Sequence, residues 1–167
     1  MIPNLKQILY PTDLGEHARL VFKYAVSLAQ HYQAQITLLH VLEPLGTYGM
    51  TLLETYIPKD ISAQLHHQTI ETVRLNMQQR VEKFCAEEFQ LTLSENHLIA
   101  DIVVVEGVPA QTIVRQAKLC QADVIVIGTH SYSPLSEVLI GSTARKVTQL
   151  SPIPVLVVPL INSGNLL

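Results

Sequence analysis

The chain has 167 residues, of which 48% are hydrophobic and 15% charged, so it can fold as one domain with its own core, and a disordered chain is excluded. A net charge of −3 with no run of Lys or Arg excludes the basic footprint of a nucleic-acid-binding protein. No apolar stretch approaches the ~20 residues that span a bilayer, and the opening residues lack the basic and apolar parts of a signal peptide. We therefore predict a cytoplasmic protein without membrane insertion.

Five short apolar runs rich in β-branched residues predict strands. They are residues 7–10, 36–41, 102–105, 124–127 and 155–158. The runs are continuous rather than alternating, so both faces of the sheet should be covered, which is typical of a parallel sheet.

Helical patterns lie between these runs. Residues 16–33 place apolar side chains at i, i+3, i+4 and i+7, a longer helix should follow Pro58, and two more should begin at Pro109 and near Ser142. Alternating strands and helices give right-handed crossovers. The predicted fold class is therefore α/β, a doubly wound five-stranded parallel sheet with helices on both faces.

We predict one domain over residues 1–167, with a core at about 5–159 and no internal repeat. Residues 42–57 carry Pro44, Gly46 and Gly49 without a helical period, which is typical either of a lid or of a mobile loop. Residues 161–167 should form a frayed tail.

The candidate binding segment lies between the fourth strand and the last helix. It begins with Gly128, Thr129, His130 and Ser131, and after nine more residues it ends with Gly141, Ser142 and Thr143. A helix N-terminus has unpaired N–H groups and a partial positive charge, and glycine lets a phosphate come close to the backbone. The alternative is structural, because Ser142 could simply cap the helix while Gly128 ends the strand.

Several blocks of the sequence resemble the universal stress protein family. The blocks are residues 6–13, 37–41, 106–109, 122–130 and 152–158. They follow the family's order and spacing from about residue 5 to 159. The resemblance implies the strand order 3-2-1-4-5, in a fold similar to that of the adenine nucleotide alpha hydrolases, with the ligand site at the carboxyl ends of strands one and four.

The resemblance also implies a binding site for ATP, with or without Mg²⁺. In the ATP-binding branch the motif is Gly, two residues, Gly, nine residues, Gly, then Ser or Thr, and Ser131 stands here in place of the middle glycine. If that position needs a left-handed backbone, serine costs ~1–2 kcal/mol, or roughly five- to thirtyfold in affinity. By resemblance, Pro11, Thr12 and Asp13 would meet the adenosine, and Val41 would face the adenine ring. Ile127, Gly128, Thr129 and His130 would line the ribose and phosphates, and Gly141, Ser142 and Thr143 would hold the phosphates.

The predicted function is a stress-response regulator that binds an adenine nucleotide and hydrolyses it slowly at most. No catalytic residues and no metal ligands are predicted, since adjacent His66 and His67 point to different sides of a helix. The family also implies a homodimer through the last strand, Val155–Val158, and an unknown protein partner. The alternative function is a dimeric interaction module of the same family that binds no nucleotide.

Overall fold

The computed structural model describes residues 2–15, 17–44, 46, 51, 55–89, 97–129 and 140–160, without the side chains of 88 and 89. The strands are β1 (Gln7–Pro11), β2 (Gln35–Leu42), β3 (Ile99–Glu106), β4 (Val124–Gly128) and β5 (Val155–Val158). They form one parallel sheet in the order β3-β2-β1-β4-β5. The predicted fold class and strand order are confirmed.

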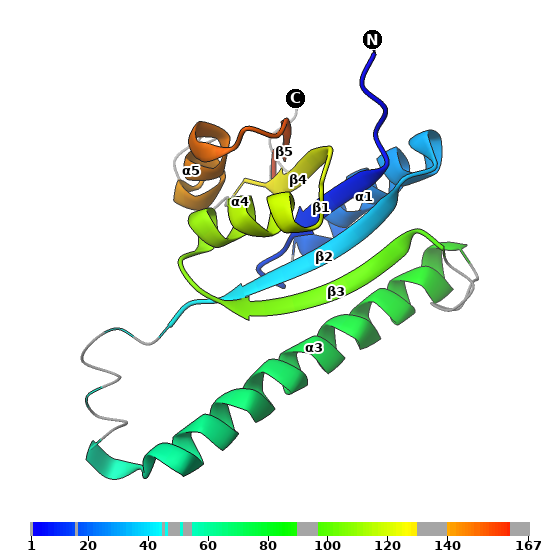
Figure 1. Ribbon diagram of the computed structural model, residues 1–167. Coiled ribbons are helices and arrows are strands. Elements are labelled where there is room, and N and C mark those ends of the chain that lie inside the picture. Colours follow the sequence, from blue (N-terminus) through cyan, green and yellow to red (C-terminus); the bar gives the residue numbers. More distant parts are fainter. Residues whose placement is uncertain are drawn as a thin grey trace, which may run out of the picture.

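Helices cover both faces of this sheet (Figure 1). They are α1 (Ala18–Tyr32), α3 (Lys59–Phe89), α4 (Pro109–Leu119) and α5 (Ser142–Leu150). The sequence explains their ends: Pro109 occupies the first turn of α4, where the missing N–H costs nothing, and Gln33 ends α1 in a left-handed conformation, with its N–H bonded to the Ala29 carbonyl.

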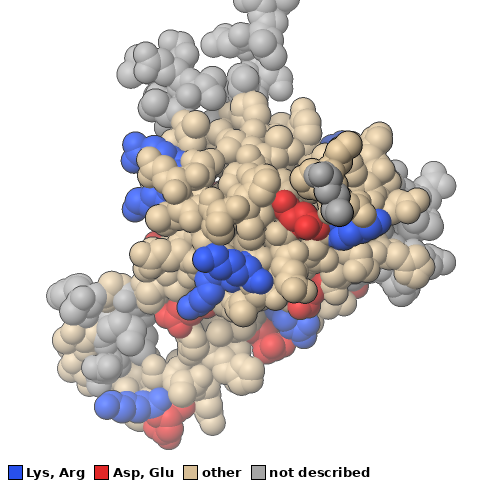
Figure 2. Space-filling view, turned by 45° about the horizontal axis from the view of Figure 1, so that its top comes forward, with Lys and Arg blue, Asp and Glu red and all other residues tan. Residues whose placement is uncertain are grey.

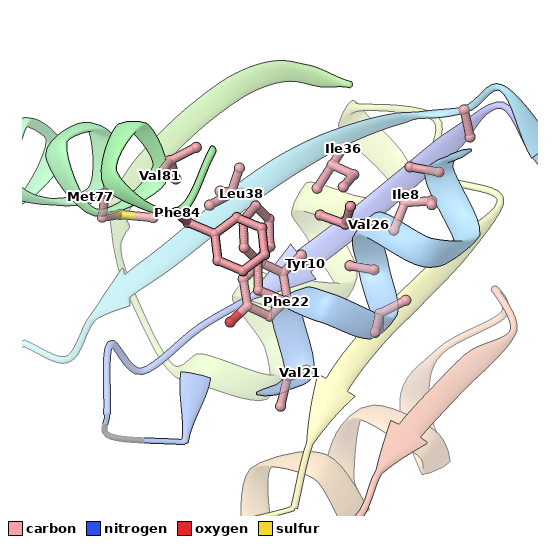
Figure 3. Packing of buried hydrophobic residues seen from close by; sticks show 14 of the residues in the cluster. Ile8, Tyr10, Val21, Phe22, Val26, Ile36, Leu38, Met77, Val81 and Phe84 are labelled. Carbon is pink, nitrogen blue, oxygen red and sulfur yellow. The ribbon is translucent and has the colours of Figure 1, made fainter. Parts of the chain in front are cut away.

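Two hydrophobic cores lie on opposite faces of the sheet. Ile8 and Tyr10 of β1 point into the core under α1 and α3, whereas Leu9 between them points into the core under α4 and α5. Figure 3 shows the first core, where Tyr10 stacks on Phe22 at 5.3 Å between ring centroids and Phe22 meets Phe84 edge to face at 4.7 Å. Successive strand residues enter different cores, which explains why the apolar runs are continuous.

Helix α3 packs on the sheet through its second half. Met77 and Val81 are buried, but Ile61 and Leu65 are 45% and 47% exposed. Ile61 and Leu65 do not enter the core, because α3 runs past the edge of the sheet there (Figure 1). His66 Nε2 lies 2.9 Å from Glu106 Oε2 and links α3 to the end of β3.

Part of the segment predicted to be an irregular loop, residues 42–57, has regular secondary structure. Leu42 is the last residue of β2, and Thr51, Thr55 and Tyr56 are helical, with the Thr55 hydroxyl donating to the Thr51 carbonyl at 2.7 Å. The predicted tail, residues 161–167, lies outside the described residues.

No helix in the described parts of the chain is long and apolar enough to cross a membrane. On the face shown in Figure 2, basic and acidic side chains are scattered among uncharged ones. This distribution agrees with the absence of a Lys or Arg run in the sequence.

Candidate functional site

A cleft of about 690 Å³ opens at the carboxyl ends of β1 and β4, where the chain turns to opposite sides of the sheet. Parallel α/β sheets bind ligands at such a switch point. Every described residue of the predicted site lines this cleft: Pro11, Thr12, Asp13, Val41, Ile127, Gly128, Thr129, Gly141, Ser142 and Thr143. His130 and Ser131 lie outside the described residues.

A tight turn after β1 forms one wall of the cleft. The Leu14 N–H donates to Thr12 Oγ1 at 3.1 Å, and the Gly15 N–H donates to Asp13 Oδ1 at 2.8 Å. Leu14 has a φ of 62°, a left-handed conformation that is uncommon for a residue with a branched side chain. These local bonds hold the turn in shape and place the exposed Asp13 at the mouth of the cleft.

Gly128 is the last residue of β4, which confirms the interpretation in which Gly128 ends the strand, and Thr129 follows it. A Cβ on Gly128 would lie 2.7 Å from Val21 Cγ2 of α1, so the glycine is required by the packing of that helix. Thr129 is 3% exposed; its N–H donates to the Val158 carbonyl at 3.0 Å, and its hydroxyl accepts from the Leu160 N–H at 2.9 Å. Thr129 therefore fastens the end of β4 to the chain after β5.

The N-terminus of α5 forms the opposite wall. The N-cap is Gly141 (φ −56°, ψ 154°), and its carbonyl accepts from the Arg145 N–H at 3.0 Å. Ser142 is the first helical residue and is exposed, so the alternative in which Ser142 caps the helix is wrong. With glycine at the cap and no side-chain cap bond from any described residue, the first turn of α5 presents its N–H groups to the cleft.

The cleft also contains residues that the sequence analysis missed. His40 lies at its base, and its Nδ1 is 2.7 Å from the Thr12 carbonyl. A carbonyl can only accept, so Nδ1 carries the proton and Nε2 is left as an acceptor when the ring is neutral. His40 stands just before Val41, the last residue of the second apolar run, and the usable signal was this position near the carboxyl end of the strand next to β1.

Tyr10 forms part of the cleft floor and is kept neutral. Its hydroxyl donates to the Ala18 carbonyl at 2.8 Å, and its side chain is 3% exposed. Burial raises the pKa of Tyr10 to about 12; a hydrogen bond with Thr12 partly opposes the shift, and the Asp13 carboxylate adds to it.

The charges of the cleft are unusual for an anion site. Its described lining includes the carboxyl groups of Asp13 and Glu43, together with His17 and His40, but no Lys or Arg. The sequence of residues 128–143 also contains no Lys or Arg and a single acidic residue, Glu137. Among the described parts of the lining, backbone N–H groups and the dipole of α5 are therefore the features that favour a negative charge.

The fold and this cleft define a class of α/β proteins with a ligand site at the switch point of a parallel sheet. The sequence profile described as "Universal stress protein family" matches residues 4–159. The chain therefore belongs to the universal stress protein family. The profile covers all the described helices and strands. It also covers all the described cleft residues except Leu160, which lies one residue beyond its end.

Individual relatives match along most of their length. Universal stress protein MJ0577 of Methanocaldococcus jannaschii is 28% identical over 95% of this chain and 97% of its own length. Universal stress protein YxiE of Bacillus subtilis is 30% identical over 91% of this chain and 97% of its own.

Solved structures agree with these sequence matches. The structure of MJ0577 superposes with a TM-score of 0.69 at 28% identity and covers 96% of this chain and all of that one (100%). The universal stress protein UspA from Lactobacillus plantarum gives a TM-score of 0.68 at 27% identity, covering 94% of this chain and 99% of that one. A universal stress protein in complex with cAMP gives 0.59 at 16% identity, covers 94% and 98%, and supports the fold alone.

Proposed function

We propose that the cleft binds an adenine nucleotide, foremost ATP, and that the protein acts as a stress-response regulator in the cytoplasm. The observation that carries this proposal is the N-terminus of α5, which faces the cleft behind a glycine cap, opposite the turn that carries Asp13. The first turn of the helix would hold the phosphates, and the region of Pro11, Asp13 and Val41 would hold the adenosine.

The size of the cleft supports a small-molecule ligand. Its volume of about 690 Å³ falls in the usual range of roughly 300–1,000 Å³ for ligand pockets. A family member that shares this fold is described in complex with cAMP, which is also an adenine nucleotide.

We also propose that ATP binds together with Mg²⁺. The triphosphate is strongly anionic, and the described lining offers Asp13 and Glu43 but no Lys or Arg to offset its charge. Mg²⁺ is commonly held by substrate phosphates and one or two carboxylates, which fits this lining. The described residues contain no group of three or more His, Cys, Asp or Glu side chains that could hold a metal ion by themselves. The ion would therefore enter with the nucleotide.

Calorimetric titration with ATP in the presence of Mg²⁺ tests the proposal. Gly141→Val should weaken binding at least tenfold, because a branched side chain would block the approach of phosphate to the helix. The φ and ψ of Gly141 suit any residue, so this variant should keep its fold. Gly46→Val, outside the cleft lining, is the matched control. Equal affinity in the wild type and Gly141→Val would refute the assignment.

The second candidate function is a dimeric interaction module, and the edge strand β5 favours it. Among the described strands β5 pairs only with β4, and Leu156 is 38% exposed. An open apolar edge is a site for pairing with a second chain. A dimer that binds neither ATP nor cAMP would establish this function instead.

A further inference from the structure

Helices α4 and α5 lie side by side on one face of the sheet (Figure 1), and all their charged side chains are basic. Four of these side chains are exposed: Arg115, Lys118, Arg145 and Lys146. Neither helix contains an Asp or Glu residue. In a chain with a net charge of −3, the two helices therefore carry a local excess of positive charge.

These four cations form no ion pair with any residue that the structure describes. On α1 and α3, by contrast, Arg19 and Lys83 share Glu87, at 2.7 Å and 3.8 Å. Arg74 of α3 likewise lies 3.3 Å from Glu71. The cations of α4 and α5 therefore take their counter-charges from outside the described chain.

Two carboxylates border this pair of helices, and both hold backbone N–H groups. Asp101 of β3 lines a small cavity together with Leu119 of α4, and its Oδ1 accepts from the Ile102 N–H at 2.7 Å. Asp123 follows α4 in the chain, and its Oδ2 accepts from the N–H groups of residues 6 and 7 at 2.7 Å and 2.8 Å. These carboxylates hold the ends of strands in place and leave the cations of the two helices unpaired.

Exposed leucines lie among the four cations. Leu119 is 69% exposed and follows Arg115 by four residues, and Leu150 is 54% exposed and follows Lys146 by four residues. Side chains four residues apart are neighbours on a helix surface, so each helix presents one leucine beside one cation. A surface of this kind suits a partner that carries carboxylates and apolar side chains together.

We infer that α4 and α5 form a docking surface for an acidic amphipathic segment of another protein. Its carboxylates would meet the guanidinium and ammonium groups, and its apolar side chains would cover Leu119 and Leu150. The inference goes beyond the proposed function, because it needs neither the nucleotide nor the open edge of β5.

Two observations favour a protein segment over other anionic partners. The remaining large apolar side chains of the two helices, Ile113, Val114 and Val147, are buried in the core, so α4 and α5 have no broad apolar face to insert into a lipid surface. The chain also has a negative net charge and no run of Lys or Arg, unlike a nucleic-acid-binding protein.

Fluorescence anisotropy with a labelled peptide, two repeats of Glu-Glu-Leu-Leu-Glu-Glu-Leu, tests the inference on the full chain. We expect saturable binding that weakens as NaCl rises from about 50 to about 300 mM. Arg115→Glu combined with Lys146→Glu should weaken binding by about fivefold or more. Leu119→Ser combined with Leu150→Ser should also weaken it, and so should replacement of every leucine of the peptide by serine.

Matched variants separate this surface from the rest of the molecule. Lys6→Glu combined with Lys59→Glu makes the same change of net charge at exposed positions of other elements and should leave the affinity unchanged. Gly141→Val and an excess of ATP should also have no effect, because the peptide would not occupy the nucleotide cleft. Circular dichroism of each variant checks that the fold is kept.

Three results would overturn the inference. The first is an absence of saturable peptide binding, and the second is equal weakening by the two charge-reversed double variants. The third is tighter binding of phosphatidylserine vesicles or duplex DNA than of the peptide, because the surface would then serve a membrane or a nucleic acid. Failure of ATP binding would leave all of these results unaffected.

Discussion

A Cβ added to Gly128 would lie 2.7 Å from Val21 Cγ2 and 3.2 Å from Leu160 Cδ1. Gly128→Ala should therefore lower the free energy of unfolding by about 1–3 kcal/mol, the cost of overpacking a well-filled site. Urea unfolding measures this change. Gly46→Ala is the control, because its Cβ would meet nothing within 4 Å among the described residues.

If steric conflict with α1 is the cause, adding Val21→Ala to Gly128→Ala should recover part of the loss. Equal destabilisation by the Gly46 and Gly128 substitutions would contradict this account. Such a result would leave ligand contact as the reason for a glycine at position 128.

Tyr10 should make stability sensitive to alkaline pH. Its pKa is about 12 in the folded protein and about 10 in an unfolded chain, so the folded state binds more protons between these values. The stabilisation is complete below pH 10 and is lost as the pH rises toward 12, by about 2–3 kcal/mol. Tyr10→Phe should remove this pH dependence.

The measurement is urea unfolding of the wild type and Tyr10→Phe from pH 8 to pH 11.5. At pH 8 the variant should be less stable by about 0.5–1.5 kcal/mol, because the hydrogen bond to Ala18 is lost. The gap should then close and change sign as the pH rises, because the wild type loses about 2 kcal/mol by pH 11.5. Parallel curves for the two proteins would show that folding does not shift the pKa of Tyr10.

At the scale of elements, α3 is held by one face of its second half. Met77 is 1% exposed, whereas Leu75, two residues away on the same helix, is 50% exposed. Met77→Ala should cost about 2–5 kcal/mol, and Leu75→Ala less than ~1 kcal/mol. Thermal or urea unfolding of this pair measures how firmly the helix is docked, and similar losses at both positions would mean that the helix packs differently.

At the scale of the whole molecule, the open edge of β5 bears on assembly. The Pro154 carbonyl accepts from Ile125 of β4 and the Val158 carbonyl accepts from Thr129, so the N–H groups of Val155 and Val157 point toward the open edge. We expect a homodimer through Val155–Val158, with twice the chain mass of 18.6 kDa in light scattering.

Val157→Pro should convert this dimer to a monomer. Proline removes the outward N–H, and an edge strand tolerates it when the bonds to its neighbour are kept. Circular dichroism serves as the control for folding. A wild-type protein with the mass of one chain, or a folded variant that remains dimeric, would rule out pairing through this strand.

Local signals predicted the strands and helices: continuous apolar runs, helical spacing, and glycine or proline at the ends of elements. The strand order and the grouping of Asp13, Val41 and Gly141 at one cleft were implied by the resemblance to the universal stress protein family. That grouping is physically reasonable, because the carboxyl ends of parallel strands meet at one edge of the sheet.

Tertiary structure decided what each residue does at that edge. Three interactions there join residues distant in the chain. The Thr129 hydroxyl accepts from the Leu160 N–H, Gly128 packs beside Val21, and His40 Nδ1 donates to the Thr12 carbonyl. The exposure of Ile61 likewise depends on where α3 leaves the sheet. A periodic pattern fixes which face of an element is apolar, but the partner of each side chain depends on how the packed elements are positioned in three dimensions.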